Sequence, residues 1–212
     1  DGLLAALAPC LPAQLAELSL DVMGCAQVGD QGVAAVAAAL PASLQTLRLN
    51  CLRTGVGDAG VRALGKAMST NLTGLVCLSL GLGEVGVSDA GVEEVAAAFP
   101  AGLLRLELNL SKALPGDTKF HISDKGFAKV ARALPRGLEG LALDLTNTGV
   151  GDAIIVELAL GLPDSVGELR VELSGTHVSA EARQRASTLA CLRDLRGRLQ
   201  SGGPTTWQEL LA

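Results

Sequence analysis

The stretch Val56-Gly57-Asp58-Ala59-Gly60-Val61 recurs along this chain with small changes. Its copies begin at Val28, Val87, Ile122 and Val150. Self-similarity at a period of about 20 to 50 residues is the signature of a stacked repeat protein. Because such an array grows by adding units around one continuous core, the recurrence predicts a single elongated domain.

A leucine-rich alternating segment precedes each copy of this stretch. The segments cover residues 15–20, 44–49, 75–82, 104–110, 138–145 and 166–173. Period two over this length predicts a strand with one buried face. After Asp58 the apolar stripe changes to helical spacing, at Val61, Leu64, Gly65 and Met68. Each unit is therefore expected to be a strand, a turn, a short amphipathic helix and a second turn.

The aspartate of each copy stands where the helix should begin. The set is Asp30, Asp58, Asp89, Asp124 and Asp152, with Asp1 at the same position of a leading helix. A carboxylate at the N-cap accepts hydrogen bonds from unpaired helix N–H groups, so each aspartate is predicted to cap its own helix. A metal role is not expected, because a calcium loop gathers its ligands within about 12 residues. A proline follows the helix in four units, at Pro41, Pro100, Pro135 and Pro163, and should end it there.

Strand, cap and helix stripe recurring in phase resemble the leucine-rich repeat family, in the helix-containing type of ribonuclease inhibitor. Between equivalent positions 15, 44, 75, 103, 138 and 166, the repeats are 29, 31, 28, 35 and 28 residues long. The resemblance implies an α/β leucine-rich-repeat solenoid, a horseshoe arc with a parallel inner sheet and short outer α-helices. The asparagine typical of that family after the strand is absent. Thr54, Thr148 and Thr176 occupy the slot, where a hydroxyl can still hydrogen-bond the turn backbone.

The domain organisation follows from this repeat register. Residues 1–178 are predicted to form the solenoid, 179–200 a basic C-terminal capping helix, and 201–212 a Gly-Pro hinge with a short tail. The chain starts at a helix without its strand, so we expect more polypeptide before Asp1 or another chain covering that end. The capping helix carries five arginines against two acids, on a chain of net charge -5.

Composition excludes several classes of function. With a pI near 5.1 and no basic stretch interleaved with aromatics, nucleic acid is not an expected partner. No apolar run approaches the roughly 18 residues of a membrane span, so a soluble intracellular protein is predicted, in the cytoplasm or an organelle interior. A removed targeting peptide is compatible with the missing start methionine. The five cysteines form no CxxC pair, which fits a reducing compartment. Cys25, Cys51 and Cys77, spaced by 26 residues, are expected to fill equivalent apolar slots.

No catalytic constellation is recognisable. The two histidines, His121 and His177, lie in expected turns and match no catalytic signature. We therefore predict no enzyme activity, no cofactor, no metal and no small-molecule substrate. One enzymatic alternative is a GTPase-activating protein, since the Ran GTPase activator is built from similar repeats, but no residue here matches its functional positions.

Strand residues that point away from the core should line the concave face. The candidates for protein binding there are Asp21, Arg48, Asn50, Ser79, Glu107, Asn109, Asp144, Arg170 and Glu172. Four acids against two arginines favour a somewhat basic partner. The absence of aromatic residues weakens this prediction, because binding hot spots are often aromatic.

Two departures from the repeat compete with the concave face. The fourth unit contains an insertion, residues 111–121, in which Lys119 and Phe120 are the binding candidates, although a tolerated surface loop is the alternative. In the tail, Trp207, Leu210 and Leu211 share one helical face and could anchor in a partner's groove or fold back on the chain itself.

The sequence thus predicts a non-catalytic protein-binding module. One version is a peripheral or scaffold subunit held permanently in a larger assembly. The other is a free recruiter or regulator that binds one protein on its concave face.

Overall fold

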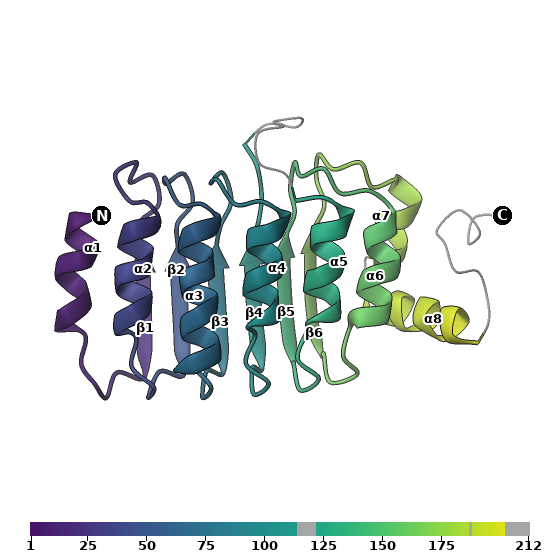
Figure 1. Cartoon of the computed structure of the whole chain (residues 1–212). Helices are drawn as coiled ribbons and strands as arrows, with labels where there is room; N and C mark the ends of the chain where they lie inside the picture. The colour runs from purple at the N-terminus through teal and green to yellow at the C-terminus, as the bar shows by residue number, and fades with distance from the viewer. Residues whose placement is uncertain (114–121, 187, 202–212) are drawn as a thin grey trace.

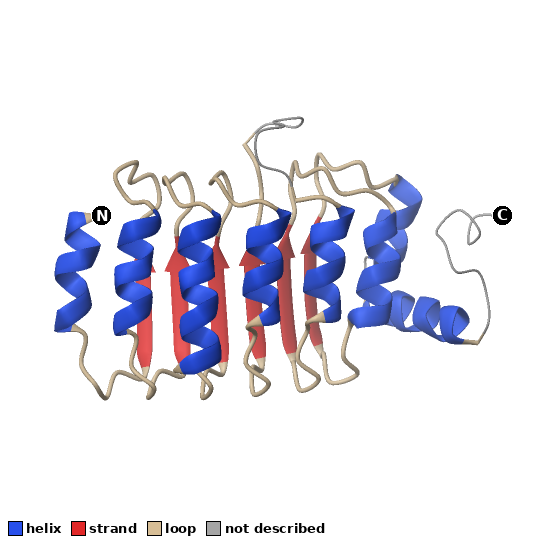
Figure 2. Cartoon of the chain, in the orientation of Figure 1, coloured by secondary structure: helices blue, strands red, loops and turns tan. Residues whose placement is uncertain are grey.

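The computed structural model describes residues 1–113, 122–186 and 188–201, and it is an α/β solenoid of the leucine-rich-repeat kind (Figures 1 and 2). Six parallel strands form one sheet in chain order: β1 (Glu17–Asp21), β2 (Thr46–Asn50), β3 (Cys77–Gly81), β4 (Arg105–Asn109), β5 (Gly140–Asp144) and β6 (Glu168–Glu172). The helices between them lie in front of the sheet in Figure 1. They are α2 (Asp30–Ala39), α3 (Asp58–Thr70), α4 (Asp89–Ala97), α5 (Asp124–Arg132) and α6 (Ala153–Gly161).

Further helices flank this array at both ends. Helix α1 (Gly2–Leu7) and a short 3-10 turn, η1 (Ala8–Cys10), precede β1. Helices α7 (Ala180–Ala186) and α8 (Leu189–Gln200) follow β6, where the sequence predicts one capping helix. The break occurs because the Thr188 hydroxyl accepts a hydrogen bond from the Cys191 backbone N–H, at 3.2 Å, and so starts a new helix. In the described part of the chain, no helix is long and apolar enough to cross a bilayer.

The strands are paired so that equivalent residues of each repeat stand side by side. Leu47 of β2 is aligned with Leu18 of β1 and with Leu78 of β3, and the same register continues to β6. Because side chains alternate between the two faces, this register sends every leucine row into the core and every intervening row to the other face.

The helices close the core from one side. Val61, Leu64 and Met68 of α3 are each 1% exposed, as the helical stripe predicts. Phe127 of α5 is fully buried and is the bulkiest side chain of the core. Burying a side chain of this size contributes roughly 1.5–3 kcal/mol to the stability of the core.

The prolines end the helices as predicted. After α2, the Pro41 carbonyl accepts a hydrogen bond from the Leu44 N–H at 3.1 Å, and the chain turns towards the next strand. The Pro100 carbonyl and the Leu103 N–H form the same turn after α4, again at 3.1 Å. The threonine prediction is also confirmed: the Thr148 hydroxyl donates to the Leu145 carbonyl at 2.6 Å.

The prediction that each aspartate caps its own helix is wrong. Helix α2 has Gly29 at its N-cap and no side-chain cap, although Asp30 is its first residue. The Asp30 carboxylate instead accepts hydrogen bonds from the next repeat, from the N–H groups of Gly57 at 2.7 Å and Gly60 at 2.8 Å. Asp1 does the same for Gly29 and Gly32.

This cross-repeat bond compensates for an N-cap residue without a side chain. Gly57 cannot cap α3, so the carboxylate of the preceding repeat satisfies the free N–H groups of that helix. Where the N-cap is Ser88, its hydroxyl accepts from the Ala90 N–H and donates to Asp58 at 2.7 Å. We call this series, which runs from Asp1 to Asp152, the aspartate ladder.

The aspartate ladder also explains the glycine two residues after each repeated aspartate. A Cβ atom at Gly91 would lie 2.3 Å from an Asp58 carboxylate oxygen, and one at Gly126 would lie 2.1 Å from Asp89. Glycine is therefore required there by the aspartate of the preceding repeat. In the fifth copy, Ile154 stands where the other copies have this glycine. Among the described residues, the Asp124 carboxylate there accepts only the Gly151 N–H.

The expectation for the three evenly spaced cysteines is wrong. Cys25 is exposed in the turn after β1, Cys51 is fully buried just after β2, and Cys77 is half-buried at the start of β3. A spacing of 26 residues is shorter than the 29 and 31 residues of these repeats, so the three positions drift through the repeat rather than superimposing.

Candidate protein-binding face

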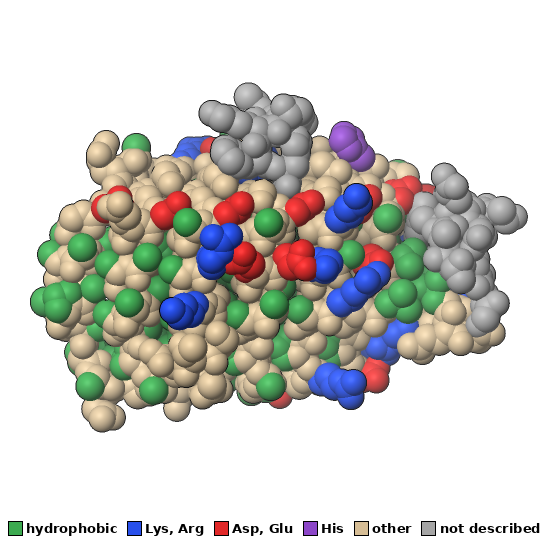
Figure 3. Space-filling model, viewed as in Figure 1, with side chains coloured by type: hydrophobic (Ala, Val, Ile, Leu, Met, Phe, Trp, Pro, Cys, Tyr) green, Lys and Arg blue, Asp and Glu red, His purple; other side chains and the backbone are tan. Residues whose placement is uncertain are grey.

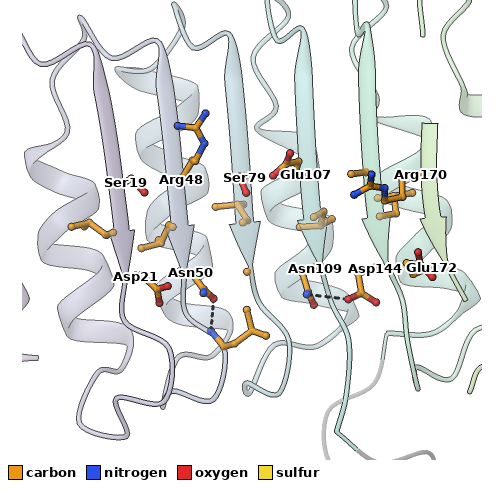
Figure 4. A pocket seen from close by; sticks show the side chains of 18 residues that line it. Ser19, Asp21, Arg48, Asn50, Ser79, Glu107, Asn109, Asp144, Arg170 and Glu172 are labelled. Atoms are coloured by element: carbon orange, nitrogen blue, oxygen red, sulfur yellow. Dashed lines mark hydrogen bonds between the residues drawn. The ribbon is translucent and has the colours of Figure 1, made fainter. Parts of the chain in front are cut away.

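The sheet face opposite the helices is hollowed, with a volume of about 660 Å³. Within the described chain, no helix packs on this face, because α2 to α6 all lie on the other side (Figure 1). All nine concave-face residues predicted from the sequence line this hollow, which spans β1 to β6. Figure 4 shows them on successive strands. The structure therefore gathers the predicted set on one surface, while its binding role stays a prediction.

Strand register sorts the outward side chains into rows that run across the sheet. The carboxyl-edge row, at the ends of the strands, consists of Asp21, Asn50, Gly81, Asn109, Asp144 and Glu172. The middle row, two residues earlier, consists of Ser19, Arg48, Ser79, Glu107, Ala142 and Arg170. Acids and amides thus concentrate in the carboxyl-edge row, whereas both arginines of the hollow belong to the middle row.

Four side chains of the carboxyl-edge row are held by the turns that follow them. A side-chain oxygen of each accepts the backbone N–H two residues on, at 3.0 Å in Asp21, Asn109 and Asp144 and at 3.3 Å in Asn50. The Asn109 amide also donates to the other Asp144 oxygen at 3.1 Å (Figure 4). These bonds fix the direction of the polar groups before any partner binds. The signal for these bonds in the sequence is an aspartate or asparagine at the end of four of the six strands.

The charges in the middle row differ in how they are satisfied. Arg48 pairs with Glu17 of β1, so its charge is partly neutralised. Glu107, Arg170 and Glu172 are exposed, and their side chains have no hydrogen bond or ion pair with any described residue. The unpaired charges of the concave face therefore concentrate over β4 and β6.

A second hollow, of about 280 Å³, opens on the same face over β4, β5 and β6. Its floor is formed by Gly140 and Ala142 of β5, and its sides by longer residues of the neighbouring strands. Arg105 and Glu168 join across one end of it, with 3.3 Å between their charged atoms.

The insertion begins beside the carboxyl-edge row. The Ser111 N–H and hydroxyl both donate to the Asn109 side chain, at 3.0 and 2.7 Å. Lys112 is buried, and its ammonium donates to the Val85 carbonyl at 3.1 Å, which fixes the base of the insertion to the preceding repeat. The described base of the insertion, residues 111–113, therefore adjoins the concave face. The candidates Lys119 and Phe120 lie outside the described residues, as do Trp207, Leu210 and Leu211 of the tail.

Arginines of the basic cap have partners within the fold. Arg193 donates to the carbonyls of Asp164 and Val166 at 2.9 and 2.8 Å. Arg196 donates to the Leu162 carbonyl at 2.7 Å and pairs with the Asp164 carboxylate. These bonds satisfy backbone acceptors at the end of the last full repeat. The excess of arginine in the cap thus has an internal structural explanation.

Charges on the helical face are largely paired. Ion pairs join neighbouring helices, with Arg62 to Glu94 at 2.6 Å and Lys129 to Glu93 at 2.6 Å. Figure 3 shows basic and acidic side chains side by side on this face. The hydrogen bond and charge of Glu94 raise the pKa of Arg62 above its ordinary value. Three such ion pairs, Arg62–Glu94, Lys129–Glu93 and Arg132–Glu157, therefore connect neighbouring helices on this face.

Groups with metal or nucleophile chemistry are sparse in the part of the chain that the structure describes. No three His, Cys, Asp or Glu side chains within it are grouped to hold a metal ion. His177 is exposed in the turn before α7, and His121 lies outside the described residues. Burial raises the pKa of the Cys51 thiol from 9.0 to about 12, and the nearby Asp21 charge adds to the shift. Cys51 is therefore a neutral thiol, not a nucleophile.

No family model matches this chain, and no curated protein matches it. A chain in the crystal structure of the Rad7 and Elc1 complex from yeast is similar in structure, with 17% sequence identity and a TM-score of 0.46. The match covers 84% of this chain and 48% of that chain, so the present chain spans about half the length of the one it resembles. The fold assignment rests on the strands, helices and register described above.

Proposed function

We propose that this protein is a non-catalytic protein-binding module that serves as a scaffold subunit of a larger assembly and holds its partner on the concave face. The observation that carries the proposal is the open sheet face, where residues of all six strands line a hollow of about 660 Å³ and hydrogen bonds hold polar side chains of four of them. Pockets and grooves formed in advance of binding lower the ordering cost of association.

Three further observations support the concave face over the other surfaces. Its charges at Glu107, Arg170 and Glu172 have no partner in the described structure, whereas charges on the helical face are paired across repeats. Arginines of the cap are used to satisfy carbonyls of the solenoid. The base of the insertion adjoins the carboxyl-edge row, so one partner could contact both.

The test combines size measurement with cross-linking of carboxylates in native extract. We expect the tagged protein to migrate in a particle well above 21.5 kDa, with reproducible cross-links from Glu107 and Glu172 to one neighbour. Ser79→Trp, in the centre of the hollow, should remove these links, while Glu181→Gln on α7 should keep them. A chain running near 21.5 kDa would refute the subunit role, and cross-links confined to the helical face would refute the concave interface.

The free-recruiter alternative predicts a different result in the same experiment. A recruiter would be recovered mostly as the free chain, with concave-face links that appear and vanish with partner concentration. No residue of the described structure favours the GTPase-activating alternative, which a GTP hydrolysis assay would test directly.

A further inference from the structure

An exposed leucine marks the C-terminal end of the helical face. Three large hydrophobic side chains are exposed in the described residues, Leu3 and Met23 near the N-terminal end and Leu160 at the end of α6. In α3 and α5 the equivalent position, eight residues after the repeated aspartate, holds Lys66 and Arg132, and in α2 and α4 it holds alanine. A charged or small side chain suits a helix face in water, so the large apolar group of α6 departs from the other repeats.

Leu160 is not isolated, because it lines a hollow of about 530 Å³. The hollow lies between the ends of α5 and α6 and the side of α8, which starts beside the end of α6 (Figure 1). Its other apolar lining residues are Leu134, Leu162 and Pro163, of which the two leucines are buried. An apolar depression with a few polar groups at its margin is the usual form of a site for a bulky side chain.

One arginine of the hollow has no partner among the described residues. Arg132 pairs with Glu157, and Arg196 pairs with Asp164. Arg136 is exposed, and its side chain has no hydrogen bond or ion pair with any residue that the structure describes. A guanidinium is attracted to the face of an aromatic ring, most strongly to that of tryptophan. The hollow thus combines exposed apolar surface with one available cation.

The chain itself supplies a segment that matches this hollow. Helix α8 lines the hollow through Arg196, and Ser201, the last described residue, lies about 7.5 Å further along the chain axis of that helix. Residues 202–206 can span roughly 20 Å when extended, so the residue after them is within reach of the hollow. That residue is Trp207, the single tryptophan of the chain.

We propose that the tail, residues 202–212, folds back on its own chain and places the Trp207 ring in this hollow. The ring covers Leu160 and stacks on the Arg136 guanidinium. The two leucines that share the helical face of the ring extend the apolar contact. The tail carries one charge, which is negative, whereas three arginines and two acids line the hollow, so the charges are complementary.

This role goes beyond the proposed function, because it gives the tail a contact within the chain rather than with a partner. The docked tail covers the end of α6 on the helical side of the solenoid. The opposite sheet face, where the partner is proposed to bind, stays open.

The fluorescence of Trp207 tests this contact directly, because the chain has no other tryptophan and no tyrosine. The measurement is acrylamide quenching of the full chain, compared with a synthetic peptide of residues 202–212. We expect a blue-shifted emission and quenching at least about threefold weaker than in the peptide, as for a ring mostly buried in a pocket. Emission and quenching like those of the peptide in the unaltered protein would overturn the docked tail.

Substitutions in the hollow locate the contact. Leu160→Glu should bring quenching to within about twofold of the peptide, because a carboxylate replaces the apolar surface. Leu3→Glu is the matched control, since it changes another exposed leucine at the opposite end of the chain and should leave quenching as it was. Arg136→Ala should raise quenching about twofold, whereas Arg62→Ala, which breaks only an exposed pair, should not. Equal effects within each pair would refute this hollow as the site.

The same quenching is measured over a wide range of protein concentrations. A contact within one chain gives shielding that does not change on dilution. Shielding that is lost on dilution would mean that the tail docks on a second copy, and the proposal would be wrong. None of the substituted residues lines the concave hollow, so cross-links from Glu107 and Glu172 should persist in Leu160→Glu. Failure of the tail contact and failure of the proposed function are therefore distinguishable.

Discussion

The Asp30 carboxylate accepts the backbone N–H of Gly57 at 2.7 Å, so the first residue of one helix caps the beginning of the next. Equivalent bonds from Asp1 to Asp152 link neighbouring repeats at the starts of their helices. It adds a polar connection to the apolar stacking of the core.

Asp30→Ala is expected to destabilise the protein by about 1–2 kcal/mol, because the N–H groups of α3 lose their acceptor. Hydrogen exchange should accelerate at the Gly57 and Gly60 amides, in the repeat after the mutation. Asp194→Ala, which breaks only an exposed pair with Arg198, should cost less than about 1 kcal/mol. Faster exchange confined to the start of α2 would contradict the aspartate ladder.

Gly126→Ala and Gly197→Ala should change stability in opposite directions. A Cβ atom at Gly126 would lie 2.1 Å from Asp89, which we expect to cost about 1–3 kcal/mol in chemical unfolding. At Gly197 of α8 no atom lies within 4 Å, and alanine should stabilise the helix by up to about 1 kcal/mol. The same sign in both variants would show that helix propensity, not the cross-repeat contact, governs the glycine after each aspartate.

The Cys51 thiol should make the protein less stable in alkali. Its pKa is about 12 in the folded state against 9.0 ordinarily, so the folded chain binds the proton more tightly. The resulting stabilisation is complete below pH 9 and is lost as the pH rises towards 12. Between pH 8 and 10 the free energy of unfolding should fall about 1.4 kcal/mol further in the unaltered protein than in Cys51→Ala. Equal decreases in the two proteins would argue against a buried, neutral thiol.

Removal of Arg196 should weaken the C-terminal cap more than removal of Arg198. The Arg196 side chain is 18% exposed and holds the Leu162 carbonyl, so Arg196→Ala should cost about 1–3 kcal/mol. Arg198 is 60% exposed in a surface pair, and its loss should cost under about 1 kcal/mol. Hydrogen exchange in α8 locates the effect. If both variants have the same stability, the cap arginines do not hold the last repeat.

Periodicity was sufficient to predict the strands, the helix stripes and the side chains of the concave face. Leu47 and Leu78 are aligned on neighbouring strands, because a shift of the register by one residue would turn the leucines of one strand away from the core. The partner of Asp30 could not be found in the same way, since it lies 27 residues away and depends on Gly57 lacking a side chain. One signal in the sequence did point to a contact between repeats. In four copies a glycine follows the aspartate by two residues, and a cap within one helix does not require that glycine.

The break in the C-terminal cap was missed for a local reason. Continuous helical spacing of apolar residues predicts one helix, but Thr188 is a strong N-cap residue and starts α8 separately from α7.

The aspartate ladder has a direction, and this defines where repeats can be exchanged. Each aspartate lies upstream of the helix that it serves, so a cut between β2 and α3 keeps Asp30 with the upstream piece and leaves Gly57 and Gly60 without an acceptor. An inserted or duplicated repeat would therefore keep these hydrogen bonds only under two conditions. It must carry an aspartate at the start of its own helix, to bind the next repeat, and a glycine or serine at its helix N-cap, whose N–H binds the aspartate of the preceding repeat.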